Sequence, residues 1–228
     1  MNKKVVLPDI TLIAVTSVNI DQTLVALSIS SENIEFSSIK LLSPTPPNHK
    51  ISNIEYVTIP KIDYLGYSRF MIKDLYKYFT TKFCLIIQAD GFVIDPNFWK
   101  NEFLNYDYIG APWWYEENNV GNAGFSLISK KMLDFIQKDD VIDLYPSDDD
   151  AICRINRKYL EENGIKFAPE ELAADFSFEA NEIRGEEWDG QFGFHSPSRE
   201  SERHPNKYRG GITNVDKWED KDNFRWPF

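Results

Sequence analysis

Carboxylates at two places in the sequence are candidates for metal binding or for catalysis. Asp90 interrupts the apolar stretch "CLIIQADGFVIDP", which spans residues 84–96. A lone ionised carboxylate in such surroundings is costly unless it is paired or binds a metal. At the carboxyl end of a strand in an open α/β sheet, it is well placed to hold a hard divalent cation. Asp90 could alternatively close a turn after the strand.

The second acidic point is "PSDDDAICR", in which Asp148, Asp149 and Asp150 open a predicted helix over 148–163. Acids in the first turn of a helix are stabilised by its dipole, and Ser147 or Asp148 can cap the end. Three adjacent carboxylates repel one another, however. Their excess favours a role for one of them as a general base toward a substrate, while capping stays open as the alternative.

A glycine turn and a late histidine are further candidates. Gly121 and Gly124 flank Asn122 ahead of a predicted strand. Glycine there allows positive φ or the close approach of a sugar ring, although a plain turn also explains it. His195, in "GQFGFHS", is either a hydrogen-bonded structural residue or the partner of Asp90 in a metal site.

Aromatic side chains suggest a binding platform. Trp113, Trp114 and Tyr115 follow a predicted strand end, and Trp188 lies near His195 in the sequence. Two adjacent tryptophans cannot easily face one core, so one of them is a candidate platform for a sugar or a base.

Composition limits the class of protein. The 228 residues are 42% hydrophobic and 14% aromatic, which indicates one globular domain. The net charge of -11 argues against nucleic-acid binding and against electrostatic docking on anionic lipid, leaving peripheral membrane contact open. Cys84 and Cys153 stand in apolar surroundings and are predicted to be buried free thiols. Without a recognisable signal peptide or transmembrane segment, we expect a cytoplasmic protein.

Strands and helices alternate in the first ninety residues, which predicts an α/β sheet with crossover connections. Strands are expected over 10–18, 38–44, 54–60 and 83–90, and helices over 21–35 and 68–79. The second half is less regular, with helices expected over 129–138 and 148–163, short strands within 106–114, 121–129 and 165–169, and a loop-dominated tail from about Glu182.

In this order, the segments resemble nucleotide-sugar-dependent glycosyltransferases of the GT-A fold. The likeness is closest to bacterial and viral glycosyltransferase-like proteins of the DUF5672 type. It covers roughly residues 80–195 and is carried by "LIIQADGFVIDPNFW", "YDYIGAPWW", "GNAGFSLIS", "SDDDAICR", "GIKFAPEELAADFSFE" and "FGFHS". It implies a Rossmann-related mixed central sheet flanked by helices in a single domain. Residues 1–95 would form the nucleotide-binding half, and residues 96–228 the acceptor half and C-terminal tail.

The resemblance also implies roles for individual residues. The Asp-x-Asp motif of GT-A enzymes corresponds to Gln88-Ala89-Asp90, where only the last acid is present. Asp90 and His195 would bind Mn²⁺ or Mg²⁺. Asp149 would take the proton of the acceptor hydroxyl, and Asp148 would bind the acceptor or donor sugar. The donor nucleotide and sugar would contact Thr16, Ser17, Val18, Gln88, Ala89, Gly121, Asn122 and Gly124.

The implied function is a metal-dependent transfer of a sugar from a nucleotide-diphosphate sugar to an acceptor hydroxyl. Inversion with an aspartate base is expected, although retaining chemistry also occurs on this fold. The acceptor would be a glycan, a lipid-linked glycan, a protein or a small molecule. Two alternatives are a glycoside hydrolase with paired carboxylates and a sugar- or nucleotide-binding module with a decayed site, which Gln88 motivates.

Overall fold

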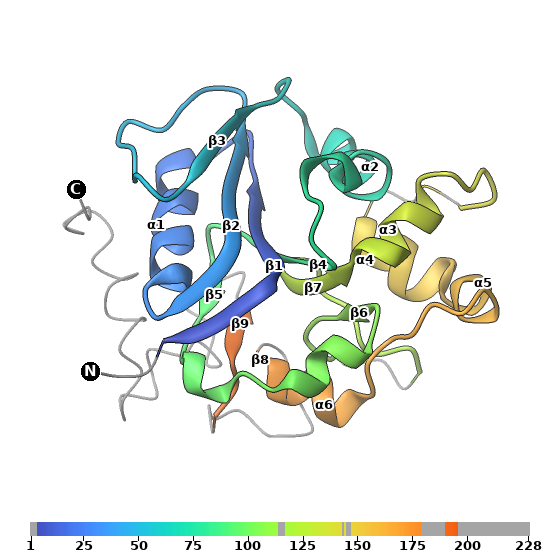
Figure 1. The fold of residues 1–228 in the computed structure, drawn as a ribbon. Coiled ribbons are helices and arrows are strands. Elements are labelled where there is room, and N and C mark those ends of the chain that lie inside the picture. The colour runs from blue at the N-terminus through green and yellow to red at the C-terminus, as the bar shows by residue number, and fades with distance from the viewer. Residues whose placement is uncertain (1–3, 114–116, 143, 145–146, 179–189, 196–228) are drawn as a thin grey trace.

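The centre of the molecule is a six-stranded sheet with strand order β3-β2-β1-β4-β7-β6 (Figure 1). The computed structural model describes residues 4–113, 117–142, 144, 147–178 and 190–195. Strands β3, β2, β1 and β4 run parallel, and β7 runs antiparallel to both of its neighbours. The predicted mixed α/β sheet is therefore confirmed. The strands are β1 Val5–Val15, β2 Ile34–Ser43, β3 Glu55–Thr58, β4 Phe83–Ile87, β6 Tyr108–Ile109 and β7 Phe125–Ser129.

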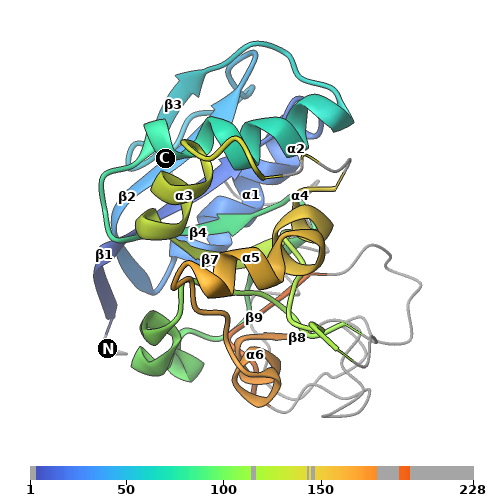
Figure 2. The ribbon, with the colours of Figure 1, turned by 90° about the vertical axis from the view of Figure 1, so that its right-hand side faces the viewer.

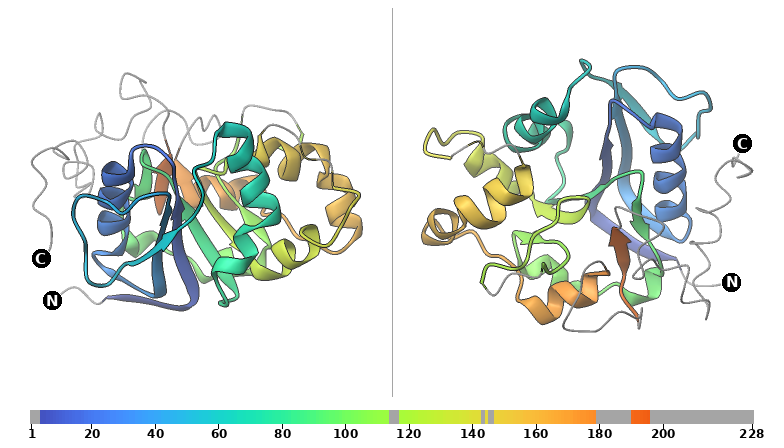
Figure 3. Two further views of the ribbon diagram at one scale, coloured as in Figure 1. Left: turned by 90° about the horizontal axis from the view of Figure 1, so that it is seen from above. Right: turned by 180° about the vertical axis from the view of Figure 1, so that it is seen from behind.

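Helices cover both faces of this sheet. Helix α1 lies on one face, and α2 and α3 lie on the other (Figures 1 and 3). Viewed from the side, α5 lies beside α4 near β7 (Figure 2). The helices are α1 Ile20–Ser31, α2 Tyr64–Lys73, α3 Lys130–Ile136, α4 Asp148–Asp150, α5 Arg157–Glu162 and α6 Glu170–Phe176, with 3₁₀ helices at Leu75–Tyr78, Pro96–Phe98 and Asn101–Asn105.

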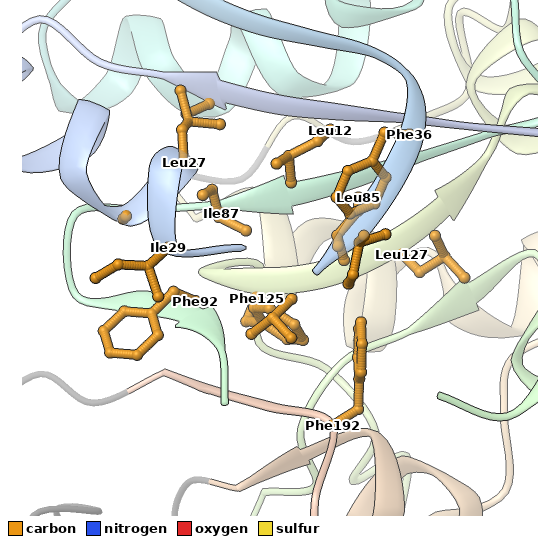
Figure 4. Packing of buried hydrophobic residues seen from close by; sticks show 14 of the residues in the cluster. Leu12, Leu27, Ile29, Phe36, Leu85, Ile87, Phe92, Phe125, Leu127 and Phe192 are labelled. Atoms are coloured by element: carbon orange, nitrogen blue, oxygen red, sulfur yellow. The ribbon is translucent and has the colours of Figure 1, made fainter. Parts of the chain in front are cut away.

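The alternation of side chains along the strands builds two cores. Leu12 and Leu85 belong to the cluster on the α1 side, whereas Ile13 and Ile86 belong to the cluster on the α2 and α3 side. All four side chains are fully buried. Because both faces of the strands are covered, the strands read as continuous apolar runs in the sequence. Figure 4 shows Leu12 and Leu85 in the first cluster.

A second, three-stranded sheet has the order β5-β9-β8. Its strands are β5 Gly91–Val93, β8 Ser177–Phe178 and β9 Gly193–His195. Gly91 pairs with His195 in the β5–β9 register, and the rings of Phe92 and Phe194 meet edge to face at 4.6 Å. This sheet therefore fixes the segment after β4 against a segment about a hundred residues downstream.

Several predicted helices have different bounds in the structure. The helix expected over 68–79 is α2, Tyr64–Lys73, followed by the 3₁₀ helix Leu75–Tyr78. Ile34 was expected in a helix over 21–35 but begins β2, because α1 already ends at Ser31. The single helix predicted over 148–163 is interrupted by a π-helical turn at Ala151–Ile155. Asn156 explains the interruption, since both its backbone N–H and its Nδ2 donate to the carbonyl oxygen of Ala151, at 3.0 and 2.9 Å.

Two further expectations can be compared with the structure. Cys84 and Cys153 are buried and form no disulfide, as predicted. Burial raises the pKa of both thiols, so both stay protonated and unreactive. Over the residues described, no helix has the length and hydropathy needed to cross a membrane.

Candidate active site

A cleft of about 780 Å³ opens where β1 and β4 end, at the carboxyl edge of the sheet. The predicted catalytic, metal-binding and donor-binding residues all line this cleft except Gly121, and the predicted platform residue Trp113 does not line it. The structure therefore brings together segments that are far apart in the sequence: the loop after β1, the start of α2, the turn after β4, the turn before β7, the start of α4 and the end of β9. This is the edge at which open α/β sheets bind ligands.

Asp90 and His195 converge inside the cleft. Asp90 lies in the turn between β4 and β5, and the β5–β9 pairing places His195 opposite its neighbour Gly91. The Nε2 atom of His195 lies 3.4 Å from Oδ1 of Asp90. Burial by itself would raise the pKa of Asp90, but the hydrogen bond and charge of His195 outweigh it, and the pKa is lowered. Asp90 is therefore a carboxylate kept ionised within a partly buried site.

The pair has the geometry of two neighbouring metal ligands. Two adjacent ligands at ~2.1 Å from an octahedral ion are about 3 Å apart, close to the separation of Asp90 and His195. Their oxygen and nitrogen donors suit a first-row ion such as Mn²⁺, and the carboxylate alone suits Mg²⁺. Within the described part of the chain, no group of three or more His, Cys, Asp or Glu side chains could hold a metal ion. These two residues would thus leave most coordination positions to oxygen atoms of a ligand and to water.

Gly124 lines the cleft and also has a packing role that the sequence did not reveal. A Cβ at this position would lie 2.2 Å from the imidazole ring of His195, so glycine here makes room for the histidine. A Cβ at Gly121 would lie 2.2 Å from the indole of Trp113, which explains the glycine outside the cleft. The positive φ of this turn falls on Asn122, at 59°, whose Oδ1 accepts from the Gly124 N–H at 3.0 Å.

The acidic cluster places two carboxylates in the cleft with different surroundings. Asp148 is only 7% exposed, and burial, followed by the charge of Asp149, raises its pKa to about 7. The pKa of Asp149 is also raised, chiefly by burial. Ser147, expected as a cap, instead donates its hydroxyl to Oδ1 of Asp149, and the Asp150 N–H donates to the same oxygen at 2.9 Å. Asp149 is therefore held in one orientation, and both acids bind protons more tightly than an ordinary aspartate.

The loop after β1 is ordered by its own side chains. The Thr16 hydroxyl donates to the carbonyl of Val18 and accepts from the Val18 N–H at 3.1 Å. The hydroxyl of Ser17 accepts from the Ile62 N–H at 3.0 Å, which ties this loop to the segment before α2. The loop thus forms a fixed wall of the cleft.

The sequence analysis did not identify Tyr67 as a residue of the cleft. Tyr67 belongs to α2 and lines the cleft, where its phenol oxygen accepts from Nε2 of Gln88 at 3.2 Å. The helix was expected to begin at residue 68. Its actual start was marked by Asp63, whose carboxylate caps α2 by accepting from the Gly66 N–H at 2.8 Å. The predicted platform residues Trp114, Tyr115 and Trp188 lie outside the described residues.

Residues 52–195 match the family described as "Protein of unknown function (DUF5672)". The chain belongs to this family. The DUF5672 segment includes Asp90, the acidic cluster and His195, at which it ends, whereas the loop after β1 precedes it. No curated protein sequence matches the chain.

Solved structures show that this DUF5672 member has the GT-A fold. The galactosyltransferase LgtC, in complex with donor and acceptor sugar analogues, superposes with a TM-score of 0.53 at 13% identity, covering 93% of this chain and 95% of LgtC. The glycosyltransferase GlyE of Streptococcus pneumoniae TIGR4 gives a TM-score of 0.55 at 13% identity. That match covers 99% of this chain and 62% of the GlyE chain.

Proposed function

We propose that this protein is a metal-dependent glycosyltransferase that moves a sugar from a nucleotide-diphosphate sugar to an acceptor hydroxyl. The observation that carries the proposal is the charge of the cleft. The described residues that line it include Asp63, Asp90, Asp148 and Asp149, but no Lys or Arg. A diphosphate would be repelled there unless a divalent cation accompanied it. LgtC and GlyE, which share the fold, are glycosyltransferases by name.

Asp90 and His195 are proposed to hold the cation, Mn²⁺ or Mg²⁺. When bound, the ion would neutralise the charge of the diphosphate leaving group. Asp90 suits this role because its lowered pKa keeps it ionised. His195 suits it because Gly91 and Gly124 leave space for its ring beside the carboxylate.

The nucleotide is proposed to lie against residues 1–95 and the acceptor against residues 96–228. Thr16, Ser17 and Val18 form the rigid wall that would receive the base, and Gln88 and Ala89 lead from it to Asp90. Asn122 lies beside Gly124 in the opposite wall, where the sugar would rest.

Asp149 is proposed as the general base of an inverting displacement. Its raised pKa makes it a stronger base than an ordinary aspartate, and Ser147 orients it. The acceptor oxygen would pass its proton to Asp149 and form a bond to the anomeric carbon, while the bond from that carbon to the diphosphate oxygen breaks. Burial and the neighbouring Asp149 raise the pKa of Asp148 to about 7, and in its protonated form Asp148 would donate a hydrogen bond to a sugar oxygen.

The alternatives are not favoured by the geometry. A hydrolase needs an acid and a base on either side of the scissile bond, whereas Asp148 and Asp149 are consecutive in one helical turn. A decayed binding module would not need Ser147 to hold Asp149 in one orientation.

The test begins with a donor screen. Thermal shift is measured with a panel of UDP- and GDP-sugars in the presence of Mn²⁺, Mg²⁺ or a chelator. At least one nucleotide sugar should stabilise the protein, and only when metal is present. If no donor stabilises it under any metal condition, the proposal is wrong.

A variant then tests the base. Asp149→Asn should bind the identified donor normally but release nucleoside diphosphate roughly 10²–10⁴-fold more slowly, with sugars or water as acceptor. Asp150→Asn is the matched control, because Asp150 lies in the same turn but does not line the cleft. Near-normal turnover by Asp149→Asn would remove Asp149 from the role of base.

A further inference from the structure

Gln88 stands where the Asp-x-Asp motif has an acid, and the structure shows what the amide does there. Its Nε2 donates to the phenol oxygen of Tyr67 at 3.2 Å. Gln88 follows β4 and Tyr67 lies on α2, so the bond joins two walls of the cleft. The substitution is therefore part of a polar pair within the cleft.

The direction of this hydrogen bond determines whether the Tyr67 O–H can donate to a ligand. Because the phenol oxygen accepts from Gln88, its own O–H is available to a further acceptor. An ionised aspartate or glutamate at position 88 has only acceptor oxygens and would itself accept the hydrogen bond of the phenol O–H. With an amide at this position, the phenol O–H of Tyr67 can donate a hydrogen bond to a ligand.

The surroundings keep the phenol protonated. Burial and the charge of Asp148 raise the pKa of Tyr67, against the opposing effect of the hydrogen bond from Gln88, and Asp149 and Asp90 raise it further. Tyr67 is therefore a donor over the whole physiological range and does not act as a base.

The same charges select the kind of acceptor. An anionic oxygen beside Tyr67 would be repelled by the carboxylates, whereas a sugar hydroxyl can accept from the phenol and donate to an aspartate. Helix α2, which carries Tyr67, packs against α4, which carries the acid pair, so Tyr67 lies on that side of the cleft. A sugar attached to a diphosphate at Asp90 and His195 would extend into this region.

We propose that Tyr67, oriented by Gln88, recognises the transferred sugar by donating its O–H to a hydroxyl oxygen of that sugar. This inference rests on the proposed glycosyltransferase function. It assigns specificity for the sugar to a residue outside the metal site and outside the acidic cluster.

The experiment compares two ligands and two variants. Affinities for the nucleotide sugar found in the donor screen and for its nucleoside diphosphate are measured by calorimetry with Mn²⁺. Tyr67→Phe should weaken binding of the nucleotide sugar about tenfold and change binding of the nucleoside diphosphate less than twofold. Tyr78→Phe, which removes a phenol outside the cleft, should change neither affinity. Melting temperatures of both variants verify the fold.

Two further measurements sharpen the result. Gln88→Glu should lose affinity for the sugar portion as Tyr67→Phe does, because the new carboxylate would accept the hydrogen bond of the phenol O–H. One donor lacking a single sugar hydroxyl should bind equally to wild type and Tyr67→Phe, which identifies the recognised oxygen.

The outcomes separate this inference from the proposed function. If wild type binds a nucleotide sugar and Tyr67→Phe binds it equally well, the inference alone is wrong. Equal losses for nucleotide sugar and nucleoside diphosphate would also overturn it, since they would indicate a nucleotide contact. If wild type binds no nucleotide sugar, the proposed function fails, and the inference fails with it.

Discussion

Replacing Asp148 by asparagine should stabilise the protein increasingly as pH rises. Burial and the neighbouring Asp149 raise the pKa of Asp148 from 3.8 to about 7. Between these values the unfolded chain releases a proton that the folded chain retains, so folding becomes less favourable as pH increases. Each unit of the pKa difference costs 1.36 kcal/mol, so the free energy of unfolding falls by about 4 kcal/mol once the pH exceeds 7. The side chain is only 7% exposed, so solvent screening reduces this figure little.

The assay is urea unfolding of wild type and Asp148→Asn between pH 4 and pH 8. The variant should gain stability relative to wild type by roughly 1.4 kcal/mol per pH unit between pH 4 and pH 7, with little change above pH 7. Asp150→Asn, in the same helical turn, is the control, because Asp150 is more exposed and pairs with Arg154 at 3.7 Å. A difference between wild type and Asp148→Asn that stays constant with pH would refute the reasoning.

Two other substitutions test the proposed metal site. Asp90→Ala should abolish the Mn²⁺-dependent rise in melting temperature with UDP or GDP, because it removes the ionised ligand; an unchanged metal response would count against Asp90. Gly124→Ala should also weaken that response, since the new Cβ would lie 2.2 Å from the ring of His195. Gly164→Ala is its control: it places a Cβ in open space at φ 79° and should cost about 1 kcal/mol of stability with no effect on metal binding. Wild-type metal affinity in Gly124→Ala would contradict the packing argument.

Sequence patterns predicted the strands of the large sheet because each has its own local signal. The apolar, β-branched runs around Leu12 and Leu85 mark strands that are buried on both faces. The small sheet carried no such signal. Strand β5 has three residues, and its partner His195 lies about a hundred positions away, so only tertiary structure reveals the pairing.

The candidate site was predictable in its residue types but not in its internal contacts. Asp90 was a candidate because a charge in an apolar segment is conspicuous, and the acidic run and His195 were candidates by residue type; the structure places them in one cleft. The reason for Gly124 was not predictable, since it depends on the ring of His195 from another strand. Tyr67 was missed for a similar reason, because its contact with Gln88 joins two elements that the sequence pattern treats separately.

The pairing of Gly91 with His195 determines when the site can exist during synthesis. All strands of the large sheet have been made once Ser129 is complete, and that sheet can assemble as the chain emerges. Asp90, however, lacks its partner until His195 has also been synthesised, roughly 3–13 seconds after Ser129 at about 5–20 residues per second. A nascent chain can therefore contain the folded sheet while the proposed metal site is still incomplete. Metal binding, measured over time during synthesis or refolding, would show when β9 pairs with β5.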